Sequence, residues 1–182
     1  MTCIVGLVHK KKVYMGGDSA GVGGLDLSVR ADPKVFKNGP FLIGFTTSFR
    51  MGQILRFEFR PPVQKTKDVE KYMVSKFIPA VHMAFDKHWW MTEKVEEKEG
   101  GRSGVFLVGY KGRLFKIDSD FQVAWNHKPF DACGCGGDYA KGAMDILYQD
   151  DRLTPEEKVE KALESAESFS GGVRAPFLII KK

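Results

Sequence analysis

The first nineteen residues constrain this chain most, because they bring a carboxylate back beside the start of the chain. Residues 4–8 form a short apolar run, residues 10–12 are three lysines typical of a polar hairpin tip, and residues 13–15 form a returning run. Two glycines then permit a tight turn that delivers Asp18. Because the two strands of a hairpin run side by side in opposite directions, the start of the first lies beside the end of the second, and the sequence predicts that Asp18 lies next to Thr2.

Thr2 would gain a chemical role if Met1 were removed, which the small size of Thr2 permits. Its hydroxyl and a free α-amine would then lie on one residue. A threonine hydroxyl attacks only when a base takes its proton, and an α-amine with an ordinary pKa of about 7.7–8.0 is partly neutral at physiological pH. A cationic lysine nearby would lower the pKa of that amine further. Lys34 and Asp18 both stand at the ends of hairpins that adjoin the first strand, so the pattern favours a threonine nucleophile tuned by these two residues.

The composition is that of one soluble globular domain spanning residues 1–182. The chain is 43% hydrophobic and 28% charged, and no run approaches the eighteen or so apolar residues of a membrane span. The net charge of +5 comes from scattered lysines and arginines without interleaved exposed aromatics, which argues against nucleic acid as a partner. Neither a membrane nor a signal peptide is expected.

The three cysteines are an odd number without a disulfide framework, which favours a reducing compartment and a cytoplasmic location. Cys133 and Cys135 are separated by one residue, the wrong spacing for a zinc site or a redox pair. We therefore expect no metal and no cofactor.

The periodicity predicts strands and helices in an order that suits sheets packed together with helices outside. Residues 19–30, rich in glycine, are expected to form a loop, and residues 91–103 a mobile charged loop. A helix is expected from Asp68 to about Trp90, with a kink at Pro79. The other expected elements are strands at 34–37, 41–45, 105–110, 113–118, 122–125 and 176–180, a helix capped by Ser48 and stopped at 60–62, a helix at 138–148, and a helix from the capping box at 154–157 to about residue 169. The last two helices are expected to turn Ile146 and Phe169 inward.

The arrangement resembles the N-terminal-nucleophile hydrolases, and among them the proteasome β-subunits and HslV-type peptidases. The motifs are Thr2-x-Ile4-Val5-Gly6, Gly16-Gly17-Asp18 and Lys34, which place the three key residues sixteen apart twice. Gly134-x-Gly136-Gly137 before a helix and Glu167-x-x-Ser170-Gly171 before the last strand also lie where that family has them. The resemblance implies an α+β fold, a four-layer αββα sandwich.

The resemblance also implies roles for individual residues. Thr2 would be nucleophile and, through its amine, proton acceptor, while Asp18 and Lys34 would tune it. The remaining implied residues are Cys135, Glu167 and Ser170 in support of the nucleophile, and Ser48, Thr46, Asp32, Arg50 and Gly136 around the oxyanion and the substrate pocket. Three of these depart from the family pattern: Cys135 replaces a serine, Glu167 an aspartate and Ser48 a glycine.

By resemblance, the chain would be a threonine endopeptidase that cleaves unfolded polypeptides inside a homo-oligomeric ring, with rings stacked on one another. By the same resemblance its partner would be a ring-shaped ATPase. This chain carries no phosphate-loop pattern with which to bind ATP itself. Two alternatives stay open: a catalytically silent assembly or scaffold protein with the same fold, and an amidase acting on a small molecule. A diverged phage-encoded or Anbu-like member of the family would fit the departures.

Overall fold

The structure is a computed structural model that describes residues 1–89 and 104–182. The charged loop predicted at 91–103, and the end predicted for the long helix at Trp90, lie outside the described residues. In chain order the elements are β1 (Ile4–His9), β2 (Lys12–Gly17), β3 (Ala20–Gly23), β4 (Asp26–Val29), β5 (Val35–Asn38), β6 (Phe41–Phe45), α1 (Phe49–Gln53), η1 (Ile54–Glu58), α2 (Val69–Tyr72), η2 (Met73–Phe77), α3 (Ile78–Trp89), β7 (Phe106–Tyr110), β8 (Arg113–Ile117), β9 (Val123–Ala124), β10 (Phe130–Cys133), α4 (Gly137–Leu147), α5 (Pro155–Phe169) and β11 (Leu178–Lys181).

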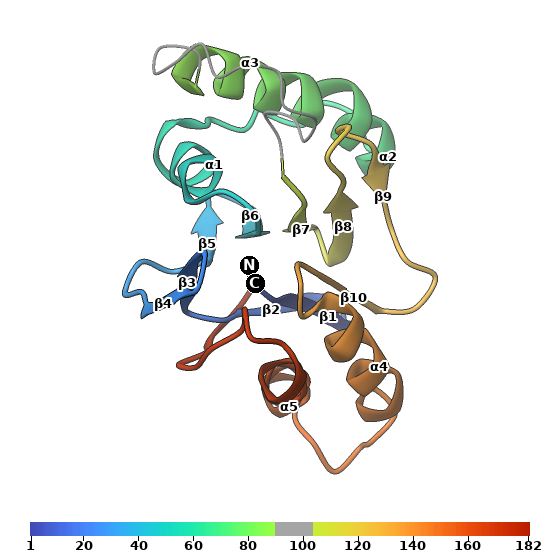
Figure 1. Ribbon diagram of the computed structural model, residues 1–182. Coiled ribbons are helices and arrows are strands. Elements are labelled where there is room, and N and C mark those ends of the chain that lie inside the picture. The colour runs from blue at the N-terminus through green and yellow to red at the C-terminus, as the bar shows by residue number, and fades with distance from the viewer. Residues whose placement is uncertain (90–103) are drawn as a thin grey trace.

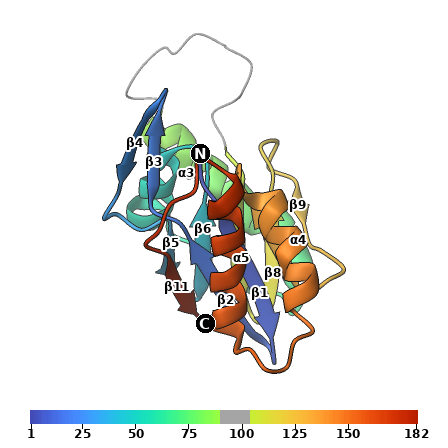
Figure 2. The same cartoon turned by 60° about the horizontal axis from the view of Figure 1, so that its bottom comes forward.

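Two antiparallel sheets lie between two layers of helices (Figures 1 and 2). One sheet has the strand order β10-β1-β2-β11 and is covered by α4 and α5, and the other has the order β5-β6-β7-β8-β9 and is covered by α1 to α3. Apolar side chains from both sheets, among them Ile4, Met15, Leu42 and Leu107, fill the space between them. The predicted four-layer αββα sandwich is confirmed.

Strand β1 runs through the middle of its sheet, and its pairing fixes what surrounds the start of the chain. Ile4 lies opposite Gly17 of β2 on one side and opposite Cys133 of β10 on the other. The tight β1–β2 turn has positive φ angles of 48° and 61° at Lys10 and Lys11, as a two-residue hairpin loop requires. The residues before β1, after β2 and after β10 therefore meet at one end of the sandwich.

The loop predicted at 19–30 is wrong, because β3 and β4 form a two-stranded hairpin there, with Ala20 opposite Val29. Its glycines and its exposure hide the alternation by which a strand is recognised in sequence: all of β4 is exposed, and Leu25 at the tip is fully so.

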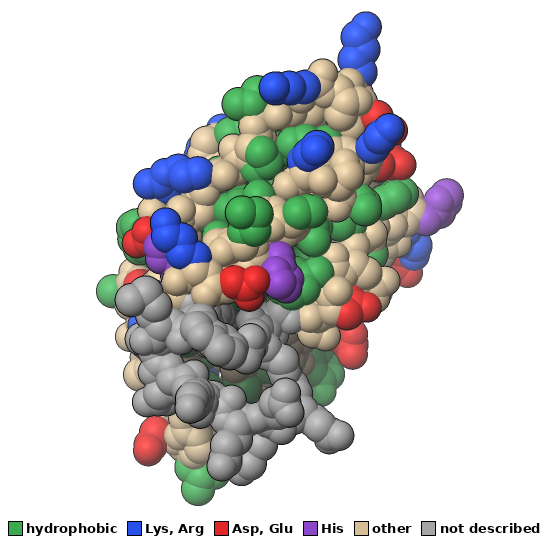
Figure 3. Space-filling view, turned by 90° about the horizontal axis from the view of Figure 1, so that it is seen from above, with side chains coloured by type: hydrophobic (Ala, Val, Ile, Leu, Met, Phe, Trp, Pro, Cys, Tyr) green, Lys and Arg blue, Asp and Glu red, His purple; other side chains and the backbone are tan. Residues whose placement is uncertain are grey.

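The expected stripe on the long helical segment is confirmed for the described side chains. Asp68 caps α2 by accepting a hydrogen bond from the Lys71 N–H, and Tyr72, Phe77 and other inward side chains join the core above the five-stranded sheet. Ahead of Pro79 the hydrogen bonding shifts to a π-helical turn, η2, with the Ile78 N–H donating to the Met73 carbonyl. Seen from the side of α3, the outer surface mixes hydrophobic side chains with scattered charges (Figure 3).

The capping box of α5 is confirmed, with Thr154 and Glu157 each bonding the other's backbone N–H. The inward placement of two helix residues is wrong: Ile146 is 79% exposed and Phe169 70% exposed. Phe169 is the last residue of α5 and packs only against the ring of Tyr139 among the aromatic contacts of the described residues, at a centroid distance of 5.7 Å. None of the helices in the described part of the chain is long and apolar enough to cross a membrane.

Candidate active site

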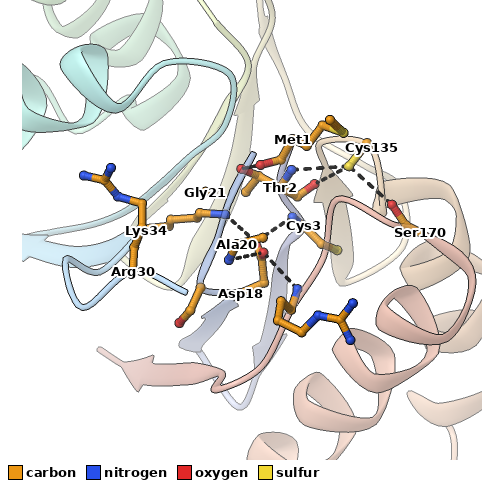
Figure 4. Close-up of polar contacts among 12 residues, drawn as sticks. Met1, Thr2, Cys3, Asp18, Ala20, Gly21, Arg30, Lys34, Cys135 and Ser170 are labelled. Carbon is orange, nitrogen blue, oxygen red and sulfur yellow. Dashed lines mark hydrogen bonds and ion pairs between the residues drawn. The ribbon is translucent and has the colours of Figure 1, made fainter. Parts of the chain in front are cut away.

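Thr2 lies just before β1 and is buried, with 4% of its surface exposed. The half-exposed Met1 covers it, and the Thr2 hydroxyl donates a hydrogen bond to the Met1 carbonyl oxygen (Figure 4). Met1 packs against the loop after α5, where a Cβ on Gly172 would collide with the Met1 side chain. The threonine is thus held in place by the fold, and Met1 lies directly over it.

Asp18 is the centre of the hydrogen bonding beneath Thr2 (Figure 4). It follows the last residue of β2, and its side chain is completely buried. One carboxylate oxygen accepts from the Cys3 N–H and from the Lys34 ammonium, both at 2.9 Å. The other accepts from the N–H groups of Ala20 at 2.9 Å and Arg174 at 3.3 Å. Four donors therefore hold the carboxylate in one position.

Lys34 precedes β5, the edge strand of the other sheet, and its side chain is 1% exposed. Burial lowers the pKa of Lys34, because removing an ammonium from water disfavours its charge, and the neighbouring Asp18 opposes that shift. The ion pair with Asp18 thus holds Lys34 next to the start of β1. This lysine gives up its proton more readily than a lysine at the surface does.

The turn after β10 cradles Thr2 from the other side. Gly134 has a φ of 93°, and a Cβ on it would collide with the Thr2 carbonyl oxygen, so only glycine fits there. The Gly136 N–H donates to that same oxygen at 3.3 Å. The Cys135 sulfur lies 3.3 Å from the Thr2 nitrogen, and the Ser170 hydroxyl donates to the sulfur at 3.4 Å.

Glu167 acts at a distance from Thr2, through the segment that follows α5. Its carboxylate accepts from the Ala175 N–H at 2.9 Å and lies 3.7 Å from the Arg174 guanidinium. The backbone N–H of Arg174 donates to Asp18, so Glu167 helps to place one of the four donors on the Asp18 carboxylate.

Ser48 and Thr46 lie at the end of β6. The Ser48 side chain caps α1, as predicted, while its N–H donates to the Thr46 carbonyl at 2.8 Å across Thr47, which has a φ of 70°. An oxyanion could use this N–H only after it leaves that carbonyl. The buried Thr46 hydroxyl donates to the Val105 carbonyl at 2.6 Å.

Asp32 and Arg50 engage neighbours that the sequence did not reveal. Arg30 forms a two-pronged ion pair with Asp32 at 2.8 and 2.7 Å, and its guanidinium stacks 3.8 Å above the ring of Phe49. Hydrogen bonding by Arg30 lowers the pKa of Asp32. Arg50 instead donates to the His88 carbonyl at 3.1 Å. Stacking and pairing at this distance in sequence leave no periodic signal, so Arg30 and Phe49 could not be found beforehand.

The described residues hold no group of three or more His, Cys, Asp or Glu side chains that could bind a metal ion. What they do bring together is a hydroxyl and a backbone nitrogen on Thr2, a buried lysine–aspartate pair and a thiol with a serine behind it. This set can activate a nucleophile by moving protons.

Comparison with known proteins gives no matching family model, but it gives relatives that match along almost the whole chain. The ATP-dependent protease subunit HslV of Caldicellulosiruptor saccharolyticus is 26% identical over 172 residues, covering 92% of this chain and 90% of that protein. The HslV subunit of Aquifex aeolicus is 27% identical over 170 residues, covering 91% and 88%.

Solved structures share the fold. Thiobacillus denitrificans BPH, in complex with epoxomicin, superposes with a TM-score of 0.79 at 19% identity and covers 100% of this chain and 98% of that one. HslV from Trypanosoma brucei gives a TM-score of 0.70 at 18% identity, covering 99% and 98%, and an Anbu mutant from Hyphomicrobium gives 0.66 at 15%, covering 98% and 80%. The resemblance predicted from the sequence is confirmed.

Proposed function

We propose that this protein, which has the fold of the HslV and proteasome β-type N-terminal-nucleophile hydrolases, is a peptidase. Its nucleophile would be Thr2, which becomes the N-terminal residue when Met1 is removed. The observation that carries the proposal is the buried Asp18–Lys34 pair, bonded to the backbone of Cys3 directly after Thr2. Burying an ion pair is costly, and hydrophobic residues in place of such a pair are often as stable or more so, which favours a chemical role for Asp18 and Lys34.

In the proposed reaction the Thr2 hydroxyl attacks the carbonyl carbon of a peptide bond while its proton passes to the α-amine. The carbon–nitrogen bond breaks, the amine product leaves with that proton, and an ester on Thr2 remains. Water then hydrolyses the ester and restores the hydroxyl. Asp18 fixes Lys34, and the Cys135 thiol with Ser170 positions the Thr2 nitrogen.

We extend the proposal to the assembly. The two HslV relatives are subunits of ATP-dependent proteases, which supports a homo-oligomeric ring, stacked in pairs, that receives unfolded polypeptides from a ring-shaped ATPase. The prediction of a cytoplasmic location is in keeping with this arrangement. Native mass spectrometry of the purified protein tests the ring, since a monomer near the chain mass of 20.4 kDa would contradict it.

The test of the nucleophile is the intact mass of the protein with and without epoxomicin, the ligand bound to the BPH relative. We expect loss of the Met1 mass and one covalent adduct per chain. The Thr2→Ala variant should form no adduct, while Thr2→Ser, which keeps the hydroxyl, should form one. An adduct that persists in Thr2→Ala would place the nucleophile elsewhere.

One observation favours a second candidate, a catalytically silent scaffold. The Ser48 N–H, the donor that the resemblance implies for the oxyanion, is already bonded to the Thr46 carbonyl. A protein that assembles into rings, retains Met1 and forms no adduct would support the scaffold over the peptidase.

A further inference from the structure

A separate cavity lies at the end of the sandwich opposite Thr2, where β1 finishes. It has a volume of about 260 Å³ and lies between Val8, the start of β8 and the segment that joins β9 to β10. At about 30 Å³ per water molecule, it could hold roughly nine waters. Its walls include Leu114, Phe115 and Phe130, so one large apolar side chain would find matching surface there.

The rim of this cavity is cationic. Arg113 and Lys128 line it, and none of its lining residues in the described chain is an Asp or Glu. Arg113 pairs with Glu70 at 2.7 Å, and Lys128 pairs with Asp145, but these two carboxylates stand outside the lining.

Further lysines lie next to the cavity, on the tips of two hairpins, one from each sheet. The tips touch, because a Cβ on Gly112 of the β7–β8 turn would lie 2.6 Å from the carbonyl oxygen of Lys11 in the β1–β2 turn. Lys10, Lys11, Lys12 and Lys111 on these tips are exposed, and no ion pair involving them is found among the described residues. With Arg113 and Lys128, the two tips and the rim carry six cationic side chains, of which only Arg113 and Lys128 pair with a carboxylate among the described residues.

Trp125 completes the cavity on one side and is half exposed at 50%. Its ring meets that of Phe115 edge-on at a centroid distance of 6.2 Å. Trp side chains are enriched where an anchoring side chain of a partner enters a pocket of a protein interface, and Trp125 lies beside such a pocket.

We propose that this cavity and the two lysine tips bind an acidic peptide segment of a partner protein, with one large apolar side chain of that segment seated in the cavity. Charge complementarity selects the acidic flanks, and the aliphatic and aromatic walls select the anchor. Single-stranded nucleic acid fits less well, since it needs a charged groove with a row of aromatic platforms for successive bases. Among the cavity residues the exposed aromatic rings are those of Trp125 and His127, two neighbours that do not make such a row.

Fluorescence anisotropy tests the proposal with a labelled eight-residue peptide of glutamates that carries one central phenylalanine. We expect it to bind at least tenfold more tightly than the same peptide with glutamine for glutamate, and at least fivefold more tightly than the one with serine for phenylalanine. Binding should weaken as salt is added, because the exposed charges are screened.

Variants locate the site. Lys11→Glu with Lys111→Glu should weaken binding at least tenfold, and Trp125→Ser about fivefold. The matched control is Lys65→Glu with Lys67→Glu, two exposed lysines ahead of α2, which should change binding less than twofold. Absence of binding by the acidic peptide, equal loss in the control, or stronger binding of an eight-residue single-stranded DNA would overturn the proposal. If Trp125→Ser fails to fold, the comparison of the Lys11→Glu/Lys111→Glu variant with the Lys65→Glu/Lys67→Glu control still tests whether the peptide binds at this site.

Discussion

Replacing Asp18 by asparagine should lower the free energy of unfolding more than almost any other substitution that changes so few atoms. The side chain of Asp18 is fully buried and accepts from three backbone N–H groups and from Lys34. An asparagine at this position would leave the Lys34 ammonium buried without its counter-charge and would turn one NH₂ group toward donors. Breaking a buried ion pair by removing one partner costs about 3–5 kcal/mol. In a chain of this size, that corresponds to a fall in Tm of roughly 6–20 °C.

A double-mutant cycle separates the pair from the backbone bonds. We expect Asp18→Asn and Lys34→Met each to cost about 3–5 kcal/mol, and the double variant to cost little more than one of them, because the second change removes the orphaned partner. Urea unfolding followed by circular dichroism gives the three free energies. The exposed Arg113–Glu70 pair serves as the control, with a cost below about 1 kcal/mol for Glu70→Gln. Strict additivity, or a cost for Asp18→Asn no greater than that of Glu70→Gln, would refute the reasoning.

Three further predictions concern the same end of the sandwich. Burial lowers the pKa of Lys34 in the folded state, so the unfolded chain binds more protons at pH values between the folded pKa and the ordinary 10.5. The contribution of Lys34 to the free energy of unfolding should therefore rise with pH through that window. Urea unfolding across pH 7–10 should show the rise, and the Lys34→Met variant should lack it. Gly134→Ala should lower the free energy of unfolding by at least about 3 kcal/mol, because alanine is strained at this φ and its Cβ would clash with the Thr2 carbonyl oxygen. The variant should also form no epoxomicin adduct. Gly142→Ala, which has open space around its Cβ, serves as the control in the same unfolding assay. N-ethylmaleimide should inactivate the protein through Cys135, the one exposed thiol, whereas Cys135→Ser should keep activity within about threefold and resist the reagent; equal inactivation of both would show that another thiol is responsible.

The sequence predicts most of this fold because its strongest signals are local. The lysine turn, the capping box at Thr154 and the apolar stripe of the long helix each follow from a rule that acts within a few residues, and the structure has all three. The glycine-rich hairpin at 20–29 escapes those rules, because its pairing depends on the backbone and not on an alternation of side chains.

The candidate site is predictable to the extent that strand pairing fixes it. Asp18 and Lys34 meet because two hairpins adjoin β1, and the sequence shows both hairpins. The N–H of Arg174 on Asp18 and the stacking of Arg30 on Phe49 depend on tertiary packing, as does the outward position of Phe169. No pattern within the chain marks such contacts in advance.

The strand order of the first sheet has a consequence for how the protein is made. Its central strands, β1 and β2, are the first to leave the ribosome, but their outer partners, β10 and β11, come from residues 130–133 and 178–181. The turn at Gly134 and the N–H of Arg174 reach Thr2 and Asp18 only after nearly the whole chain has been synthesised. A growing chain therefore carries Thr2 and Asp18 from the outset, but the groups that surround them are complete only when the last strands have been made.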